Sequence, residues 1–160
     1  MKKQMLILLP LILAWLSISE VHAASPAVYI AEVQAPLKTV YPKVYAALEE
    51  NHFFVVFEAN IGRNISRFAE RWGEDYNRSG LNEIRSMVVC NGWYANQVSN
   101  KDPDMLALCP LRLTLTEKDG ATRVLFARPT VIAAGSPALD VLREVEQTII
   151  KSINEAVGQK

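Results

Sequence analysis

The sequence predicts an α/β domain of the α+β type, a two-layer sandwich in which helices pack on a mainly antiparallel sheet. Three observations support this fold class. A hairpin signal surrounds Asp119-Gly120, two long amphipathic helices are predicted near residues 37–48 and 139–156, and the elements follow the order β-α-β-α-β-α-β-β-α. Long helices combined with an antiparallel hairpin favour two layers, with the helices packed on one sheet.

The chain after residue 27 begins with a strand and a helix. Residues 28–33 are predicted as the first strand, and apolar residues then recur at helical spacing through residues 37–48. Thr39 is the predicted N-cap of this helix, because a hydroxyl there can accept a backbone hydrogen bond. Asn51 is its predicted left-handed C-terminal cap.

Strand and helix continue to alternate through the middle of the chain. Residues 53–57 are apolar at every position, which predicts a strand covered on both faces. A second helix is predicted over residues 65–72 and ends at Gly73. Residues 84–90 form the third strand, and a short helix follows at residues 93–98.

The turn at Asp119-Gly120 sets the register of the last two strands, because this dipeptide favours a two-residue type I′ turn. The fourth strand is expected to begin near Cys109. The predicted cross-strand pairs are Lys118 with Ala121, Thr116 with Arg123, Leu115 with Val124, Thr114 with Leu125, and Leu113 with Phe126. This register places apolar residues on one face and mostly polar residues on the other, as a half-buried sheet requires.

The last helix is predicted to open at Ser136-Pro137, where the serine is the N-cap and the proline lies in the first turn. Its apolar residues recur at three- and four-residue intervals, which indicates one buried face. This buried stripe consists of Leu139, Leu142, Val145, Ile149, Ile153 and Ala156. Arg143, Gln147 and Lys151 lie on the opposite, solvent-facing side.

The N-terminus has the layout of a secretory signal peptide. Lys2 and Lys3 precede an apolar run over residues 5–18, and small residues precede a cut expected after Ala23. The run is too short for a membrane-spanning helix, which needs about 20 apolar residues. We expect residues 1–23 to be removed and residues 24–160 to form one periplasmic or secreted domain, with no stable membrane anchor after cleavage.

The charge of the mature chain argues against some partners. Cleavage removes two of the 17 basic and one of the 17 acidic residues, which leaves 137 residues with a net charge of −1. Such a protein has no overall electrostatic field to hold nucleic acid or an anionic membrane surface. We therefore expect no nucleic-acid partner.

The middle of the chain resembles the domain-of-unknown-function 302 family, and the likeness covers about residues 37–157. The family has a Cys-Asn-Pro at the end of a strand, a Pro-Cys that opens the hairpin, and an Asp-Pro after it. The matching segments in this chain are Cys90-Asn91-Gly92, Cys109-Pro110-Leu111 and Arg128-Pro129. The resemblance implies a bacterial host, the two-layer fold and a dimer. It implies no reaction.

The chain departs from the family at two of these positions. Leu111 stands where the family has its second cysteine, and the thiol of Cys109 lies two residues earlier, about 6.6 Å along the strand. Arg128 replaces an acidic residue. The resemblance therefore carries over neither a two-cysteine site nor a carboxylate role.

Cys90 and Cys109 are the only cysteines, and an even count in an exported protein suggests a disulfide. Closing this loop would stabilise the fold by about 3 kcal/mol in the chain-entropy model. One alternative is two separate buried thiols that act as small apolar residues. The other is a redox or soft-metal site, with Zn or Cu held by both thiols and His52, although the spacing gives no support to this site.

Other residues give weaker candidates for binding. Arg63, Arg67 and Arg71 recur every four residues and would form an anion-binding stripe, or else a solvated face of mixed charge. Trp93 and Tyr94 follow Cys90 closely and would line a pocket beside the thiols, or else belong to the core.

No motif in the sequence assigns a catalytic residue or a cofactor. The chain lacks a Gly-x-Ser-x-Gly elbow, a haem-attachment motif and a Gly-rich phosphate loop. We therefore expect a non-enzymatic module that binds a small ligand or a protein. It would be a homodimer packed through the uncovered face of the strand at residues 53–57. The alternative is a thiol-based redox or soft-metal protein that uses Cys90 and Cys109.

Overall fold

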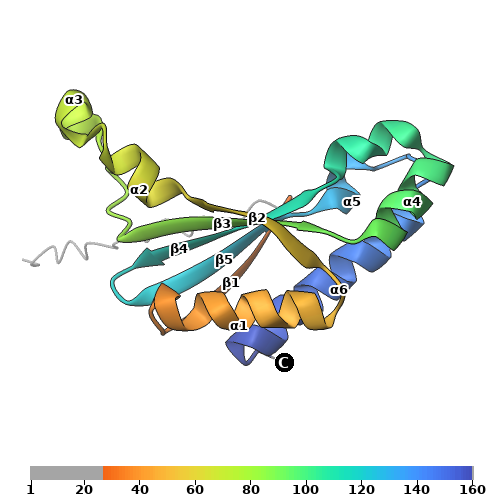
Figure 1. Ribbon diagram of the computed structural model, residues 1–160, viewed down its shortest axis with the longest axis horizontal. Helices are drawn as coiled ribbons and strands as arrows, with labels where there is room; N and C mark the ends of the chain where they lie inside the picture. The colour runs from red at the N-terminus through yellow and green to blue at the C-terminus, as the bar shows by residue number, and fades with distance from the viewer. Residues whose placement is uncertain (1–26, 160) are drawn as a thin grey trace, which may run out of the picture.

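The computed structural model describes residues 27–159, so the predicted signal peptide at residues 1–23 lies outside the described residues. It contains one antiparallel sheet with helices packed on it (Figure 1), which confirms the predicted fold class. The strands are β1 (Val28–Val33), β2 (Phe54–Asn60), β3 (Glu83–Cys90), β4 (Leu111–Lys118) and β5 (Ala121–Ala127). The α-helices are α1 (Leu37–Glu50), α2 (Ile61–Ser66), α3 (Ala69–Trp72), α4 (Gly92–Lys101), α5 (Pro129–Ile132) and α6 (Leu139–Val157). Two 3₁₀ helices, η1 (Gly73–Asp75) and η2 (Pro103–Leu108), complete the elements of the described residues.

The strands lie in the order β1-β5-β4-β3-β2, and every neighbouring pair is antiparallel. The first strand of the chain, β1, therefore pairs with the last one, β5. The two edges of the sheet are β1 and β2. The predicted hairpin register is confirmed at all five pairs, including Leu115 with Val124 and Leu113 with Phe126. Asp119 and Gly120 both have positive φ angles, 51° and 77°, as a type I′ turn requires.

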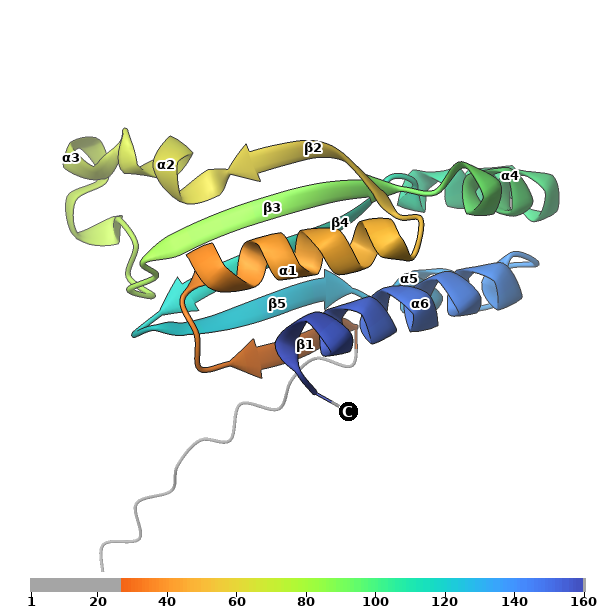
Figure 2. The ribbon, with the colours of Figure 1, turned by 60° about the horizontal axis from the view of Figure 1, so that its bottom comes forward.

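Helices α1 and α6 cover one face of the sheet and enclose the core (Figure 2). Alternate strand residues point into this layer, and Met87, Leu113, Leu115, Val124 and Phe126 are all fully buried there. The buried stripe of α6 faces the same core, and its central residues are completely enclosed. A second, smaller cluster joins α4, α5 and the first turns of α6 at one end of the sheet.

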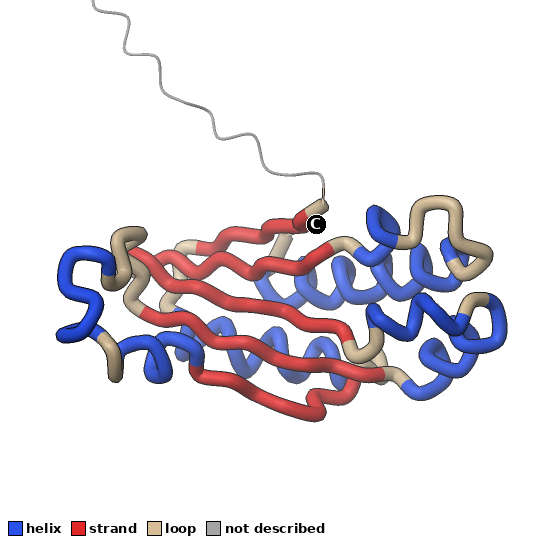
Figure 3. Tube along the Cα trace, turned by 90° about the horizontal axis from the view of Figure 1, so that it is seen from above, coloured by secondary structure: helices blue, strands red, loops and turns tan. Residues whose placement is uncertain are grey.

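The other face of the sheet carries no helix, as Figure 3 shows from above. By strand register, its central positions are Ser86 and Thr114, whose hydroxyl oxygens lie 3.3 Å apart. Arg112 also lies on this face, opposite Val88. The two ends of the open face are bounded by α2 and α3 on one side and by α4 and η2 on the other (Figure 1).

The prediction of a single helix over residues 65–72 is wrong in both its bounds and its continuity. The structure has two short helices there, α2 and α3, separated at Phe68. The first begins earlier than predicted, because the side chain of Asn60 accepts a 2.8 Å hydrogen bond from the backbone N–H of Arg63.

Two predicted N-caps are wrong, and the C-cap of α1 lies at Asn51 as predicted but is not left-handed. Helix α1 begins before Thr39, and the carboxylate of Glu117 on β4 accepts a 2.7 Å hydrogen bond from the N–H of Leu37. Its left-handed residue is His52, with φ 62°, whereas Asn51 has φ −94°. Helix α6 begins at Leu139 rather than at Ser136, because Ser136 forms a preceding turn in which its hydroxyl accepts from the N–H of Ala138 at 3.1 Å.

The prediction that residues 53–57 form a strand covered on both faces is wrong. Phe53 is buried, but β2 begins at Phe54 and lies at the edge of the sheet. A bulge shifts its register between Val55 and Phe57, so the strand does not keep a strict alternation. Apolar composition alone does not distinguish a strand enclosed in the core from an edge strand with exposed apolar side chains.

Candidate functional site

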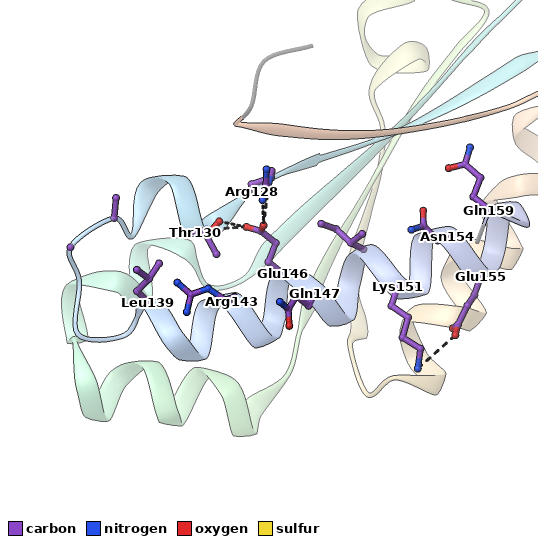
Figure 4. A pocket seen from close by; sticks show the side chains of 13 residues that line it. Arg128, Thr130, Leu139, Arg143, Glu146, Gln147, Lys151, Asn154, Glu155 and Gln159 are labelled. Carbon is purple, nitrogen blue, oxygen red and sulfur yellow. Dashed lines mark hydrogen bonds and ion pairs between the residues drawn. The ribbon is translucent and has the colours of Figure 1, made fainter. Parts of the chain in front are cut away.

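A groove of about 870 Å³ runs along one side of α6 (Figure 4). Its lining residues on α6 recur at three- and four-residue intervals, from Leu139 to Glu155, so they share one face of the helix. The opposite wall comes from Arg128, from Thr130 on α5 and from the turn at Ala134 and Gly135. A groove of this volume is in the range that small-molecule ligands occupy.

An ion pair between Arg128 and Glu146 connects the two walls of this groove. Arg128 donates from Nη2 and Nε to Oε1 of Glu146, at 2.7 and 2.8 Å. Thr130 donates its backbone N–H and its hydroxyl to Oε2, at 3.1 and 2.5 Å. Glu146 is only 4% exposed, so these four bonds satisfy a carboxylate that has left solvent.

The protonation of Glu146 follows from this environment. Burial by itself would raise the pKa of the carboxyl, but the hydrogen bonds from Thr130 and Arg128 outweigh it. The pKa of Glu146 is therefore lowered, and the group is a carboxylate at neutral pH. It holds the loop after β5 against α6 and is not poised to donate a proton.

The outer part of the groove has a different chemical character. Lys151 lies 3.7 Å from Glu155, whereas no ion pair joins Arg143 to any acidic residue of the described chain. Leu139 and Ile150 supply apolar surface beside these groups, and the two amides Gln147 and Asn154 also line the groove. The lining carries three cationic and two anionic side chains, so its net charge is positive.

Cys90 and Cys109 face the same small cavity. Cys90 ends β3 and Cys109 precedes β4, and both line an enclosed space of about 20 Å³. Tyr94 closes one side and stacks on Phe53 with ring centroids 5.9 Å apart. Both cysteines are free thiols in the structure, so the predicted disulfide stays a prediction.

The surroundings of Cys109 do not activate its thiol. Burial raises the pKa of Cys109, and the neighbouring Cys90 raises it further. A raised pKa lowers the fraction of thiolate at neutral pH, and the thiolate is the nucleophile. Cys109 is therefore mainly a neutral thiol at neutral pH.

His52 and Trp93 lie apart from the thiol cavity. Both line a neighbouring hollow of about 460 Å³, together with Phe54 and Tyr94. Trp93 is 67% exposed, whereas Tyr94 is half-buried and borders both spaces. Within residues 27–159, no group of three or more His, Cys, Asp or Glu side chains is placed to hold a metal ion.

The predicted arginine stripe is divided by the break in the second helix. Arg63 lies on α2, Arg67 at the end of α2 and Arg71 on α3, and all three are exposed. Arg63 lines a hollow of about 370 Å³ between α2 and the start of β3, and neither Arg67 nor Arg71 lines that hollow. The structure does not bring the three guanidinium groups together in one described pocket.

Sequence reasoning missed the buried ion pair at the groove. The signal was present, because Glu146 lies four residues after Leu142 and three before Ile149, within the apolar stripe of α6. A carboxylate at such a position needs a buried partner. That partner, Arg128, is 18 residues away in the sequence and on another element, so no local pattern connects the two.

The two-layer arrangement defines a small α+β domain with an open groove along its C-terminal helix, and the comparisons with known proteins agree with this class. The chain belongs to the family described as domain of unknown function DUF302, whose match covers residues 29–156. A crystal structure of an uncharacterized conserved protein DUF302 from Bacillus stearothermophilus is similar, with a TM-score of 0.70 and 17% sequence identity. The match covers 82% of this chain and 99% of that one, and it shows a shared fold. The search of curated proteins found no match.

No helix among residues 27–159 is long and apolar enough to cross a membrane.

Proposed function

We propose that this chain is a non-enzymatic binding module of the periplasm or the extracellular space, whose groove along α6 takes a small organic anion with an apolar part. The observation that carries this proposal is Arg143, a cation at the groove with no acidic partner in the described chain. The other charged side chains of the lining are paired, Arg128 with Glu146 and Lys151 with Glu155.

The composition of the groove favours an amphiphilic ligand over a fully polar one. Leu139 and Ile150, with the aliphatic stems of Arg143 and Lys151, offer apolar surface that gains free energy when covered. A guanidinium beside this surface would form charge-assisted hydrogen bonds with a carboxylate or a similar oxyanion. Arg128 already pairs with the buried carboxylate of Glu146, so we assign the ligand's charge to Arg143 and not to Arg128.

The location outside the cytoplasm rests on the N-terminal sequence. Two lysines, a short apolar run and small residues before Ala23 form the three-part pattern of a secretory signal. Edman sequencing or intact mass of protein recovered from the periplasm of an expressing bacterium tests this point. A mature chain that starts at Ala24 supports export, and an intact chain confined to the cytosol refutes it.

Ligand binding is tested by calorimetric titration with three probes: octanoate, octanol and acetate. We expect octanoate to bind more tightly than either, because only octanoate supplies both the charge and the apolar chain. The variant Arg143→Gln should weaken octanoate binding by about tenfold or more, since a lost charge-assisted hydrogen bond costs about 1.5–3 kcal/mol. Arg112→Gln, which changes an exposed arginine on the open sheet face, is the matched control.

Two outcomes would refute the groove as a site for organic anions. One is octanoate affinity that is equal in the wild-type protein and in Arg143→Gln. The other is an octanoate affinity no greater than that for octanol.

A second candidate function is thiol–disulfide exchange, and it is favoured by the shared cavity of Cys90 and Cys109. In this reaction a small disulfide oxidant would take two electrons and two protons from the two thiols. An intrachain disulfide and two small thiols would be the products. Incubation with oxidised glutathione followed by intact mass measurement tests it. A loss of two hydrogens without an adduct supports the reaction, and two thiols that remain fully alkylatable refute it.

A further inference from the structure

The edge strand β1 lies beside the groove along α6. Within residues 27–159 it pairs with β5 alone, so its outer side faces no other strand. Two residues that line the groove contact this strand near its two ends (Figure 4). The backbone N–H of Arg128 donates to the carbonyl oxygen of Ala27 at 2.8 Å. The side chain of Gln159 donates to the carbonyl oxygen of Glu32 at 2.9 Å. The sheet edge and the groove therefore form one continuous surface.

The register of β1 with β5 determines which of its backbone groups point outward. In an antiparallel pair, alternate residues exchange hydrogen bonds with the partner strand. The bond between Arg128 and Ala27 makes Ala27 one of the residues that face β5. Val28, Ile30 and Glu32 therefore direct their backbone N–H and C=O groups away from β5.

One of these outward groups already has a partner from the groove. The side-chain amide of Gln159 donates to the carbonyl oxygen of Glu32, as the backbone N–H of an added strand would. Val28 and Ile30 lie before this point, and no strand within residues 27–159 pairs with their outer side. These two residues offer a pairing site for about four residues of extended chain, since each hydrogen-bonded residue of an antiparallel pair recurs at every second position.

A strand added beside β1 would direct every second side chain toward the α6 layer, because side chains alternate across a sheet. Tyr29 shows this direction, since it donates its side-chain hydroxyl to Asn154 on α6. Asn154 lines the groove, together with the apolar side chains of Leu139 and Ile150. Alternate apolar side chains of an extended peptide would therefore cover the groove while its backbone pairs with the sheet edge.

The order of residues along the groove sets the direction of such a peptide. Arg143 lies one turn before Glu146, whose partner Arg128 contacts the chain just before β1. Asn154 and Gln159 contact β1 farther along the strand. All neighbouring strands of this sheet are antiparallel, and an antiparallel peptide would end beside the start of β1. Its C-terminal carboxylate would then lie at the Arg143 end of the groove.

We propose that the groove and the outer edge of β1 together bind the C-terminus of an extended peptide, which adds antiparallel to β1 as a further strand. This inference rests on the proposed function, because it identifies the organic anion as a peptide carboxylate and the apolar part as alternate side chains. Backbone hydrogen bonds to Val28 and Ile30 supply affinity, and the groove selects apolar side chains. Arg143 binds the terminal carboxylate through charge-assisted hydrogen bonds.

Peptides with a modified backbone test this pairing by calorimetric titration. The probe is an acetylated pentapeptide of alternating valine and threonine that ends in valine with a free carboxylate. When its valines face α6, the N–H groups of its threonines face β1. N-methylation of both threonines should lower the affinity by about tenfold or more, because it removes two hydrogen bonds. N-methylation of the first two valines is the matched control, and it should leave the affinity nearly unchanged. A C-terminal amide should also bind about tenfold more weakly, because it has no charge for Arg143.

A proline in β1 tests the same edge from the side of the protein. Ile30→Pro removes an outward N–H that β5 does not use, and its ring obstructs an added strand. This variant should lose peptide binding and keep the octanoate affinity of the wild-type protein. Ile30→Ala separates the backbone effect from the side-chain effect, since it retains the N–H. It should bind the peptide about tenfold more tightly than Ile30→Pro. Circular dichroism checks that both variants are folded, and the N-methylated peptides give the same test on the unchanged protein.

The results separate this proposal from the function on which it rests. Octanoate binding without peptide binding overturns strand addition and leaves the groove as a site for small anions. Equal affinities of the two N-methylated peptides, or wild-type peptide affinity in folded Ile30→Pro, also overturn it. A protein that binds neither octanoate nor the pentapeptide refutes the groove itself as a binding site.

Discussion

Arg128 and Glu146 form an ion pair with a 2.7 Å Nη2–Oε1 distance, and it joins the segment after β5 to the centre of α6. The carboxylate is almost fully buried, whereas the guanidinium keeps 39% of its side-chain surface exposed. The Glu146 end of the pair is therefore buried, and the Arg128 end contacts solvent. It fixes the distance between the two walls of the candidate ligand groove.

The first prediction concerns the removal of this charge. Glu146→Gln should lower the free energy of unfolding by about 1–3 kcal/mol, because Arg128 loses its anionic partner while Thr130 keeps an acceptor. Urea unfolding at neutral pH measures the change. Glu155→Gln removes the exposed pair with Lys151 and should change stability by less than about 0.5 kcal/mol. Equal effects of the two substitutions would contradict the structural role of Glu146.

A second prediction follows from the lowered pKa of Glu146. A carboxyl whose pKa is lower in the folded state stabilises the protein above its ordinary pKa of 4.5 and loses that contribution as the pH falls through the folded value. The stability difference between wild-type protein and Glu146→Gln should therefore be constant near neutral pH and shrink in acid. Urea unfolding at about pH 7 and about pH 3 checks this. A difference that grows in acid would mean that the pKa is raised.

The third prediction tests the turn between β4 and β5. Gly120→Ala should destabilise the fold by about 1 kcal/mol, because alanine at a φ of 77° is strained although no atom lies within 4 Å of the added Cβ. Gly92→Ala adds a methyl group in equally open space at the start of α4, without a positive φ. It should change stability by at most about 0.5 kcal/mol. Thermal unfolding compares the two, and equal losses would contradict the assigned turn geometry.

The fourth prediction concerns the reactivity of Cys109. In the Cys90→Ala variant Cys109 is the only thiol, and its alkylation by iodoacetamide at neutral pH should be slower than that of a free cysteine. Burial is the larger cause of its raised pKa and remains in this variant, so the rate should increase steeply as the pH rises. A pH–rate profile of alkylation measures it. A rate that is already maximal at pH 7 would show a lowered pKa instead.

Local signals predicted some elements more accurately than others. The β4–β5 register followed from Asp119-Gly120 alone, because a two-residue turn fixes every pair that leads away from it. The first strand, Val28–Val33, was also predicted correctly from its composition and its closing proline. The apolar stripe of α6 is likewise a local pattern, and its central residues are buried as expected.

The features that sequence reasoning missed depend on contacts between distant segments. The N-terminus of α1 is capped by Glu117, which is 80 residues away, so the nearby Thr39 was a misleading signal. The position of β2 at an edge depends on the order of all five strands, which no local pattern contains. Likewise, the candidate groove is formed between α6 and the segment from Arg128 to Gly135, and no local sequence pattern predicts that these two segments lie side by side.

The pairing of β1 with β5 has a consequence for how the chain reaches its native state. The strand that is synthesised first finds its hydrogen-bonding partner only at residues 121–127. During translation, the ribosome must therefore release nearly all of the domain before the sheet can close. Such distant pairing slows folding, since a long loop loses entropy before its ends gain contacts. We therefore expect the sheet to close only after residues 121–127 have been synthesised, because β1 has no other strand partner within the described residues.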